Sequence, residues 1–203
     1  MKKIIVLLFA ASLCACAAPA VKKENAVVVP GGTSVVCFGD SLTYGKGSSE
    51  GNSYPDVLAG KIDSPVVNLG VNSETAVQAL KRLDSVFEHN PYIVIIEFGG
   101  NDVLQGVPFN ETLKAIRTMV TATQQHGAVA VVVAVGDAPF MRKYNDAYKK
   151  IAKETDSVFV PGIYDGFFDD DSLKADYLHP NDTGYAVFAQ RIFYTVDKLK
   201  LWR

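Results

Sequence analysis

Five short apolar runs, each rich in β-branched residues, constrain the fold of this chain more than any other feature. Each run is nearly continuous in apolar character, which is typical of strands that are buried on both faces. The sequence therefore predicts a parallel sheet covered on both sides. The runs are SVVCF (34–38), SPVVNL (64–69), YIVIIEF (92–98), AVAVVVAV (128–135) and SVFVPG (157–162).

Amphipathic segments separate these runs, with apolar residues at helical spacing in 74–89, 111–126, 140–155 and 183–200. Strands that alternate with helices predict one α/β domain, doubly wound and flavodoxin-like, with a five-stranded parallel sheet. We expect it to span residues 34–203. A flavin-binding protein has the same strand pattern, but the sequence lacks a glycine-rich phosphate loop.

The N-terminus has the layout of a secretory signal, with Met1-Lys2-Lys3, an apolar run over 4–13 and small residues after it. We expect a signal peptide over residues 1–15 and a flexible tether over 16–33. The sequence LCAC resembles the lipobox of bacterial lipoproteins, in which Cys16 is lipidated and anchors the protein to the outer membrane. Ordinary cleavage within Ala-Cys-Ala is the alternative, and it gives a soluble periplasmic or secreted protein.

The composition of the chain argues against several kinds of binding partner and site. The net charge of −2 and the absence of a basic stripe argue against nucleic-acid binding. Cys37 lies in an apolar run and is interpreted as a buried hydrophobic residue, so no disulfide is expected. The acidic run 169–171 lacks the spacing of a calcium loop. We expect a monomer that uses neither a metal nor a cofactor.

Polar residues directly follow the expected strands. Asp40 and Ser41 follow the first, Asn101 follows the third after two glycines, and DYLHPND (176–182) leads into the last helix. Ligands of doubly wound folds bind beyond the carboxyl ends of the strands. We therefore expect these residues to meet in one crevice.

Three of these residues supply what a serine hydrolase needs. Ser41 offers a nucleophilic hydroxyl, His179 a base, and Asp176 a carboxylate that fixes the imidazole tautomer. Asp176 lies three residues before His179, so one loop can carry both. Taken singly, Ser41 is also an ordinary turn residue and Asp176 an ordinary cap or loop residue. His89 and His126 are explained by the helix ends that they occupy.

An acyl-transfer enzyme also needs donors for the oxyanion of its tetrahedral intermediate. The Asn101 side chain can donate one hydrogen bond, although a turn Asn is the alternative interpretation. The backbone N–H groups of Ser41 and of the turn at 70–73 can supply others. Asp40 is expected to orient its loop through backbone hydrogen bonds rather than to act as the catalytic acid.

Three motifs resemble the SGNH (GDSL) hydrolase superfamily in its own order: FGDSLTYG (38–45), EFGGND (97–102) and DYLHPNDTGY (176–185). The resemblance covers about residues 33–200. It implies that Ser41 is the nucleophile, that Asn101 is an oxyanion donor, and that Asp176 and His179 complete the triad. VIIEFGGNDVLQG is similar to the small periplasmic esterases that also act as thioesterases and lysophospholipases.

In one position the chain departs from that subgroup. The resemblance implies that a glycine N–H completes the oxyanion hole, and in VNLGVNSETAV this position falls on Ser73. A serine keeps the N–H, but its Cβ disfavours positive φ. Ser73 is the predicted second donor, with Gly70 as the fallback.

The expected activity is serine esterase chemistry through an acyl-enzyme. The resemblance implies aryl or short-to-medium acyl esters, lysophospholipids or acyl thioesters as substrates. A carbohydrate O-acetylesterase is the alternative enzyme, and a surface binding module is the alternative without catalysis. The predicted wall of the acyl pocket consists of Val103, Leu104, Val107, Pro139, Phe140 and Met141.

Overall fold

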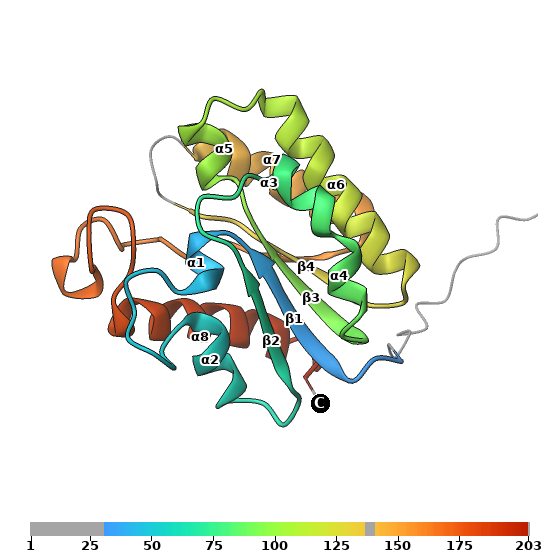
Figure 1. Ribbon diagram of the computed structural model, residues 1–203, viewed down its shortest axis with the longest axis horizontal. Helices are drawn as coiled ribbons and strands as arrows, with labels where there is room; N and C mark the ends of the chain where they lie inside the picture. Colours follow the sequence, from blue (N-terminus) through green and yellow to red (C-terminus); the bar gives the residue numbers. More distant parts are fainter. Residues whose placement is uncertain (1–30, 137–140, 203) are drawn as a thin grey trace, which may run out of the picture.

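A five-stranded parallel sheet forms the centre of the protein, in the order β2-β1-β3-β4-β5 (Figure 1). The computed structural model describes residues 31–136 and 141–202. The predicted signal peptide, Cys16, most of the tether, Pro139 and Phe140 lie outside them. The sheet confirms the predicted fold class. Its strands are β1 (Ser34–Gly39), β2 (Val66–Gly70), β3 (Pro91–Glu97), β4 (Val129–Val133) and β5 (Val158–Val160).

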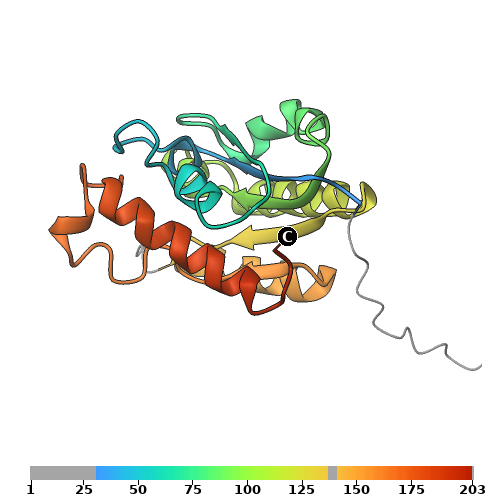
Figure 2. The same ribbon diagram turned by 90° about the horizontal axis from the view of Figure 1, so that it is seen from below.

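Helices cover both faces of the sheet (Figures 1 and 2). One face carries α3 (Ala76–Ala79), α4 (Asp84–Phe87), α6 (Phe109–Gln125) and α7 (Arg142–Thr155). The other carries α2 (Tyr54–Ala59) and α8 (Asp182–Asp197). Two short helices, α1 (Ser41–Tyr44) and α5 (Gly100–Leu104), stand at the carboxyl edge of the sheet. Among the described residues, no helix is both long enough and apolar enough to span a bilayer.

The predicted helix over 74–89 is wrong as a single element. The chain forms α3, a 3₁₀ turn over Leu80–Arg82 and α4 instead. The interruption places the Arg82 guanidinium 4.4 Å from the ring centroid of Phe38, where it also donates to Gly39 O at 3.3 Å. Arg82 thus ties this segment to the end of β1.

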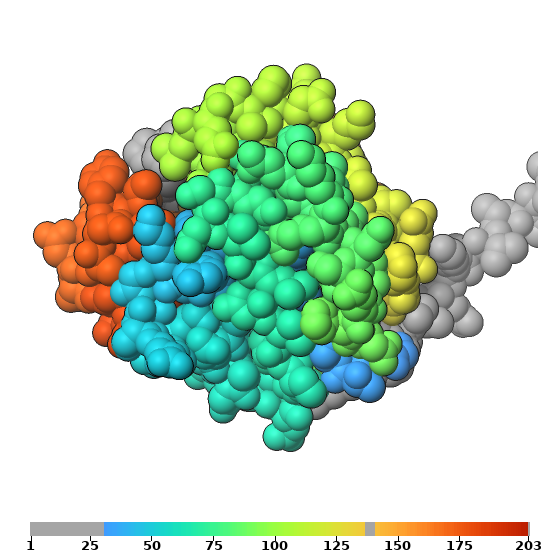
Figure 3. Space-filling model, viewed as in Figure 1, coloured from blue at the N-terminus to red at the C-terminus, as the bar shows by residue number. Residues whose placement is uncertain are grey.

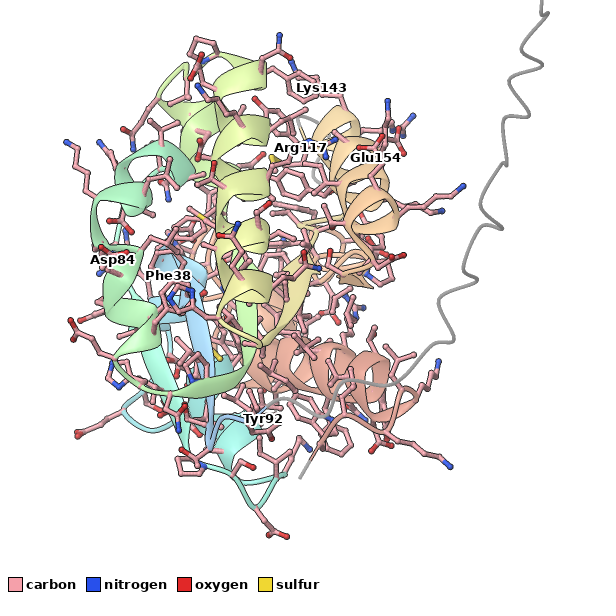
Figure 4. All side chains as sticks on the ribbon, turned by 90° about the vertical axis from the view of Figure 1, so that its right-hand side faces the viewer. Phe38, Asp84, Tyr92, Arg117, Lys143 and Glu154 are labelled. Carbon is pink, nitrogen blue, oxygen red and sulfur yellow. The ribbon has the colours of Figure 1, made fainter. Side chains whose placement is uncertain are left out.

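The core explains why the apolar runs predicted strands. Every residue of β1 and β3 is buried, and each strand pairs with neighbours on both sides. Burial of one Val or Ile side chain stabilises the fold by about 1.5–3 kcal/mol. Between α6 and α7, Arg117 and Glu154 form an ion pair (Figure 4). Because the pair is exposed, it contributes little, and packing holds these helices.

The strand order locates the crevice. From β1 the chain passes to β2 on one side and then returns to β3 on the other side. In such sheets the ligand binds where the order reverses, beyond the carboxyl ends of the two strands. Here β1 ends at Gly39 and β3 ends at Glu97. The segments that follow them carry Ser41 and Asn101, so the topology brings these two residues together.

Candidate active site

Ser41 is the first residue of α1, and Asp40 caps that helix. Asp40 Oδ1 accepts a hydrogen bond of 3.0 Å from the N–H of Leu42. Ser41 is 9% exposed and lines a cavity of about 210 Å³. As the first residue of a helix, Ser41 has an N–H without an intrahelical acceptor, which is the kind of donor that a ligand in the cavity can use.

His179 and Asp176 reach Ser41 from the segment before α8. His179 Nε2 lies 3.2 Å from Ser41 Oγ, and His179 Nδ1 lies 2.8 Å from Asp176 Oδ2. Figure 3 shows the α1 segment beside this segment at the left of the molecule. The hydroxyl, imidazole and carboxylate thus form a continuous line of contacts, as the sequence predicts.

The loop that carries the pair is held by its own backbone. Asp176 Oδ1 accepts hydrogen bonds of 2.8 Å from the N–H groups of both Leu178 and His179. The N–H of Ala175 donates to His179 O at 2.8 Å. The buried Tyr164 hydroxyl donates to Leu178 O. These contacts fix the imidazole relative to the rest of the site.

The carboxyl of Asp176 is held in its charged form. Loss of hydration raises its pKa, but hydrogen bonds from the Leu178 N–H, the His179 ring and the His179 N–H outweigh this and lower the pKa to about 2. Asp176 is therefore ionised at neutral pH. A carboxylate at this place favours the proton on His179 Nδ1, which leaves Nε2 as the acceptor for the Ser41 hydroxyl.

Asn101 lies at the start of α5, after a glycine that no other residue can replace without strain. Gly99 has φ 122°, and a Cβ there would lie 2.5 Å from the Tyr148 hydroxyl. The Asn101 side chain lines the cavity, and its Nδ2 donates to Asp40 Oδ2 at 3.0 Å. An amide nitrogen carries two hydrogens, so one remains for a ligand in the cavity.

Ser73 adopts a positive φ, the conformation that its Cβ disfavours. Its φ is 63°, in the left-handed region, and the residue lines the cavity. Gln105 Nε2 holds the turn by donating to Ser73 O at 2.7 Å. Ser73 thus carries the strain that a glycine at this position avoids.

The fallback residue Gly70 does not fit the role of an oxyanion donor. Its N–H donates to Asn68 Oδ1 at 2.9 Å and is therefore occupied. A Cβ at this position would lie 2.0 Å from Tyr44 N. Gly70 instead permits the close approach of α1 to β2.

The substitution Ser73→Gly should therefore stabilise the protein. The left-handed conformation costs a non-glycine residue roughly 1–2 kcal/mol, and the extra freedom of glycine in the unfolded chain offsets about 0.5–1 kcal/mol of that. We expect a gain of up to about 1 kcal/mol in the free energy of unfolding by urea titration, with esterase activity retained because the N–H remains. Ser73→Ala is the control, since it keeps both the Cβ and the strain; an equal gain in that variant would contradict this explanation.

The cavity has few residues in common with the predicted acyl pocket. Of its described members, only Leu104 lines the cavity. Met141 is fully buried, Val103 packs against the core, and Val107 does not line the cavity. The sequence did not indicate the lining residues Leu42, Lys46, Val135, Tyr164, Phe168 and Leu178. Three of them belong to the irregular segment before α8, which has no periodicity to reveal a buried face.

The acidic run 169–171 has structural partners. Asp170 Oδ1 accepts from the N–H of Ser172 at 2.9 Å, and Asp171 pairs with Lys174 at 2.7 Å. No group of three or more His, Cys, Asp or Glu residues within 31–136 and 141–202 is arranged to hold a metal ion.

Comparison with known proteins gives consistent similarities. The sequence profile of the GDSL-like lipase/acylhydrolase family matches residues 37–187. Thioesterase 1/protease 1/lysophospholipase L1 of Escherichia coli K12 is 30% identical over 157 residues, which are 73% of this chain and 76% of that protein. The arylesterase of Vibrio mimicus is 27% identical over 138 residues, which are 63% of this chain and 69% of that protein.

A solved structure shares the fold. The psychrotrophic esterase EstA from Pseudoalteromonas sp., in a structure inhibited by monoethylphosphonate, superposes with a TM-score of 0.73 at 21% identity. The match covers 83% of this chain and 98% of that one.

Proposed function

Since this chain belongs to the GDSL-like lipase/acylhydrolase family and is a hydrolase that acts on esters, we propose that Ser41 is its nucleophile. His179 is the general base, and Asp176 orients it. The single observation that best supports these roles is the unbroken line of contacts, with 3.2 Å between Ser41 Oγ and His179 Nε2 and 2.8 Å between His179 Nδ1 and Asp176 Oδ2.

The reaction proceeds in two halves. Ser41 Oγ attacks the ester carbonyl while its proton passes to His179 Nε2, and Asp176 stabilises the imidazolium. The oxyanion accepts hydrogen bonds from the N–H groups of Ser41 and Ser73 and from Asn101 Nδ2. The intermediate collapses, and His179 returns the proton to the departing alcohol, which leaves an acyl-enzyme. Water attacks that ester by the same route, releases the carboxylic acid and restores Ser41.

The substitution Asn101→Ala should lower kcat by about 10²–10³-fold, since it removes one donor that acts on the oxyanion. KM should change little, because the ground-state carbonyl carries much less charge than the oxyanion. Steady-state kinetics on a p-nitrophenyl ester measure both constants, and a thermal melt checks the fold. A change in KM alone would exclude the oxyanion role.

The cavity supports a substrate with an acyl chain longer than acetyl. Its walls include the apolar side chains of Leu104, Val135, Phe168 and Leu178, around a volume of about 210 Å³. We propose aryl and short-to-medium acyl esters as the substrate class, with lysophospholipids and acyl thioesters as related substrates. The names of the curated relatives support this choice. The acetyl group that a glycan O-acetylesterase removes is too short to need such an apolar wall.

Initial rates on p-nitrophenyl esters from acetyl to palmitoyl test this proposal, with the Ser41→Ala variant as the blank and acetylated xylan beside them. A Ser41-dependent maximum at butyryl or a longer chain is the expected result. Activity confined to acetyl esters and strongest on the polysaccharide would move the protein to the glycan deacetylases. No Ser41-dependent rate on any substrate would contradict the proposal.

We also propose that the protein is exported and anchored through a lipid on Cys16. The support is the sequence LCAC after an apolar run. The substitution Cys16→Ala should move the protein from the membrane fraction to the soluble fraction of the cell envelope. An unchanged distribution in the two fractions would overturn the lipid anchor.

A further inference from the structure

A fully buried carboxyl group lies beneath the candidate site, and the mechanism above gives it no role. Glu97 is the last residue of β3 and is 0% exposed. Its Oε2 accepts a hydrogen bond of 3.1 Å from Thr43 Oγ1. Its Oε1 meets no hydrogen-bond donor among the described residues. An ionised carboxylate with one unsatisfied oxygen is costly to bury, so the group needs another partner or another protonation state.

The partner is Asp40, which directly follows Gly39, the residue that pairs with Glu97 in the register of β1 and β3. The two carboxyl groups share a side-chain hydrogen bond. Two ionised carboxylates only accept hydrogen bonds, so a bond between them requires a proton on one of the two. Burial raises the pKa of Asp40 to about 7. Burial, together with the charge of Asp40, raises the pKa of Glu97 well above its usual range. One shared proton satisfies Glu97 Oε1 and removes the repulsion.

The hydrogen-bond donors around the pair indicate where the proton resides. Asp40 accepts from the N–H of Leu42 and from Asn101 Nδ2, both at 3.0 Å, and each stabilises a negative charge. Glu97 accepts from the Thr43 hydroxyl, which itself lies 3.0 Å from the Tyr54 hydroxyl, and from the backbone N–H of Asp40. Asp40 lines the cavity, whereas Glu97 is 0% exposed, and the bond between the two carboxyls lowers the pKa of Asp40 and raises that of Glu97. The charge is therefore better placed on Asp40 and the proton on Glu97 Oε1.

We propose that Glu97, in its protonated form, is a positioning residue for Asn101, acting through a hydrogen bond that it donates to the Asp40 carboxylate. The charged Asp40 accepts from Asn101 Nδ2 and so orients that nitrogen, with its second hydrogen, toward the oxyanion. Without the Glu97 donor, Asp40 itself takes the proton. Its O–H then favours the flipped amide of Asn101, which turns a carbonyl oxygen toward the developing negative charge. The inference rests on the proposed oxyanion role of Asn101.

Two substitutions separate this role from simple filling of the core. Glu97→Gln reproduces the protonated acid, because an amide N–H donates to Asp40 while the amide oxygen accepts from Thr43. Glu97→Met has a similar length but cannot donate. We expect Glu97→Gln to keep kcat within a few-fold of wild type, and Glu97→Met to lower kcat by up to about 10²-fold with little change in KM.

A double-mutant cycle tests whether the effect passes through Asn101. In the Asn101→Ala background, Glu97→Met should cause little further loss of kcat, because the donor that it positions is already absent. An equal further loss in that background would overturn the proposal. So would a Glu97→Gln variant as impaired as Glu97→Met, or an unchanged kcat in Glu97→Met.

Infrared spectroscopy gives a readout that does not depend on activity or on the Met variant. At neutral pH the wild-type protein should show the C=O stretching band of a protonated carboxylic acid, and Glu97→Gln should lack it. Survival of that band in Glu97→Gln would place the proton elsewhere and overturn the proposal. The Ser41→Ala variant distinguishes failure of the proposed function from failure of this inference. Retained activity in that variant would contradict the proposed function but would not change the infrared result.

Discussion

Replacement of Ser41 with Ala should lower kcat for ester hydrolysis by about 10⁶-fold, the loss seen when a serine protease loses its nucleophile. The side chain makes one hydrogen-bonding contact among the described residues, to His179 Nε2 at 3.2 Å. The residue is 9% exposed and begins a helix that Asp40 caps, and alanine is compatible with that position. The fold should therefore persist, and initial rates on p-nitrophenyl butyrate together with a thermal melt check both expectations.

Ser48→Ala is the matched control for this variant. Ser48 lies in the same segment, and its hydroxyl donates to Gly45 O at 2.8 Å without reaching His179. Its removal should leave kcat within a few-fold of wild type. Hydrolysis by Ser41→Ala at the wild-type rate would eliminate the proposed mechanism.

The second large effect is expected for Asp176→Asn, which should lower kcat by about 10⁴-fold. An asparagine oxygen can still accept from the N–H groups of Leu178 and His179, so the loop keeps its shape. Its amide nitrogen, however, then faces His179 Nδ1, where Asp176 Oδ2 now lies at 2.8 Å. The ring must carry its proton on Nε2 and can no longer accept the proton of Ser41.

Kinetics on the same ester and a thermal melt check this expectation. The control is Asp171→Asn, because Asp171 belongs to the same segment but pairs with Lys174 at the surface. That variant should retain activity within a few-fold of wild type. Near wild-type kcat in Asp176→Asn would mean that another group orients His179.

The sequence predicted those parts of the site that lie directly next to strands. Asp40 and Ser41 follow β1, and Asn101 follows β3 after two glycines, so the strand order alone brings them to one edge. His179 and Asp176 were predictable because three residues separate them and one loop can carry both. The sequence also showed that a serine, Ser73, stands where the resemblance implies a glycine, although only the structure gives its φ of 63°.

Elements without a periodic signal could not be predicted. The helices α1, α2 and α5 have four to six residues each, too few for an amphipathic pattern. The cavity wall includes Tyr164, Phe168 and Leu178 because the irregular segment before α8 folds over the carboxyl edge. Glu97 could have been recognised from the sequence, because it is a charged residue within the apolar run YIVIIEF. Charged residues are rarely buried without a partner.

The proposal that Ser41 forms a covalent acyl-enzyme is tested most directly by labelling with an organophosphonate ester, which reacts with an activated serine to give a stable adduct. Intact-protein mass and peptide mapping would follow the adduct while esterase activity is recorded. The expected result is one adduct per chain on the peptide that contains Ser41, formed in proportion to the loss of activity and absent from Ser41→Ala. Full inhibition with the adduct on another residue would contradict the assignment of Ser41 as the nucleophile.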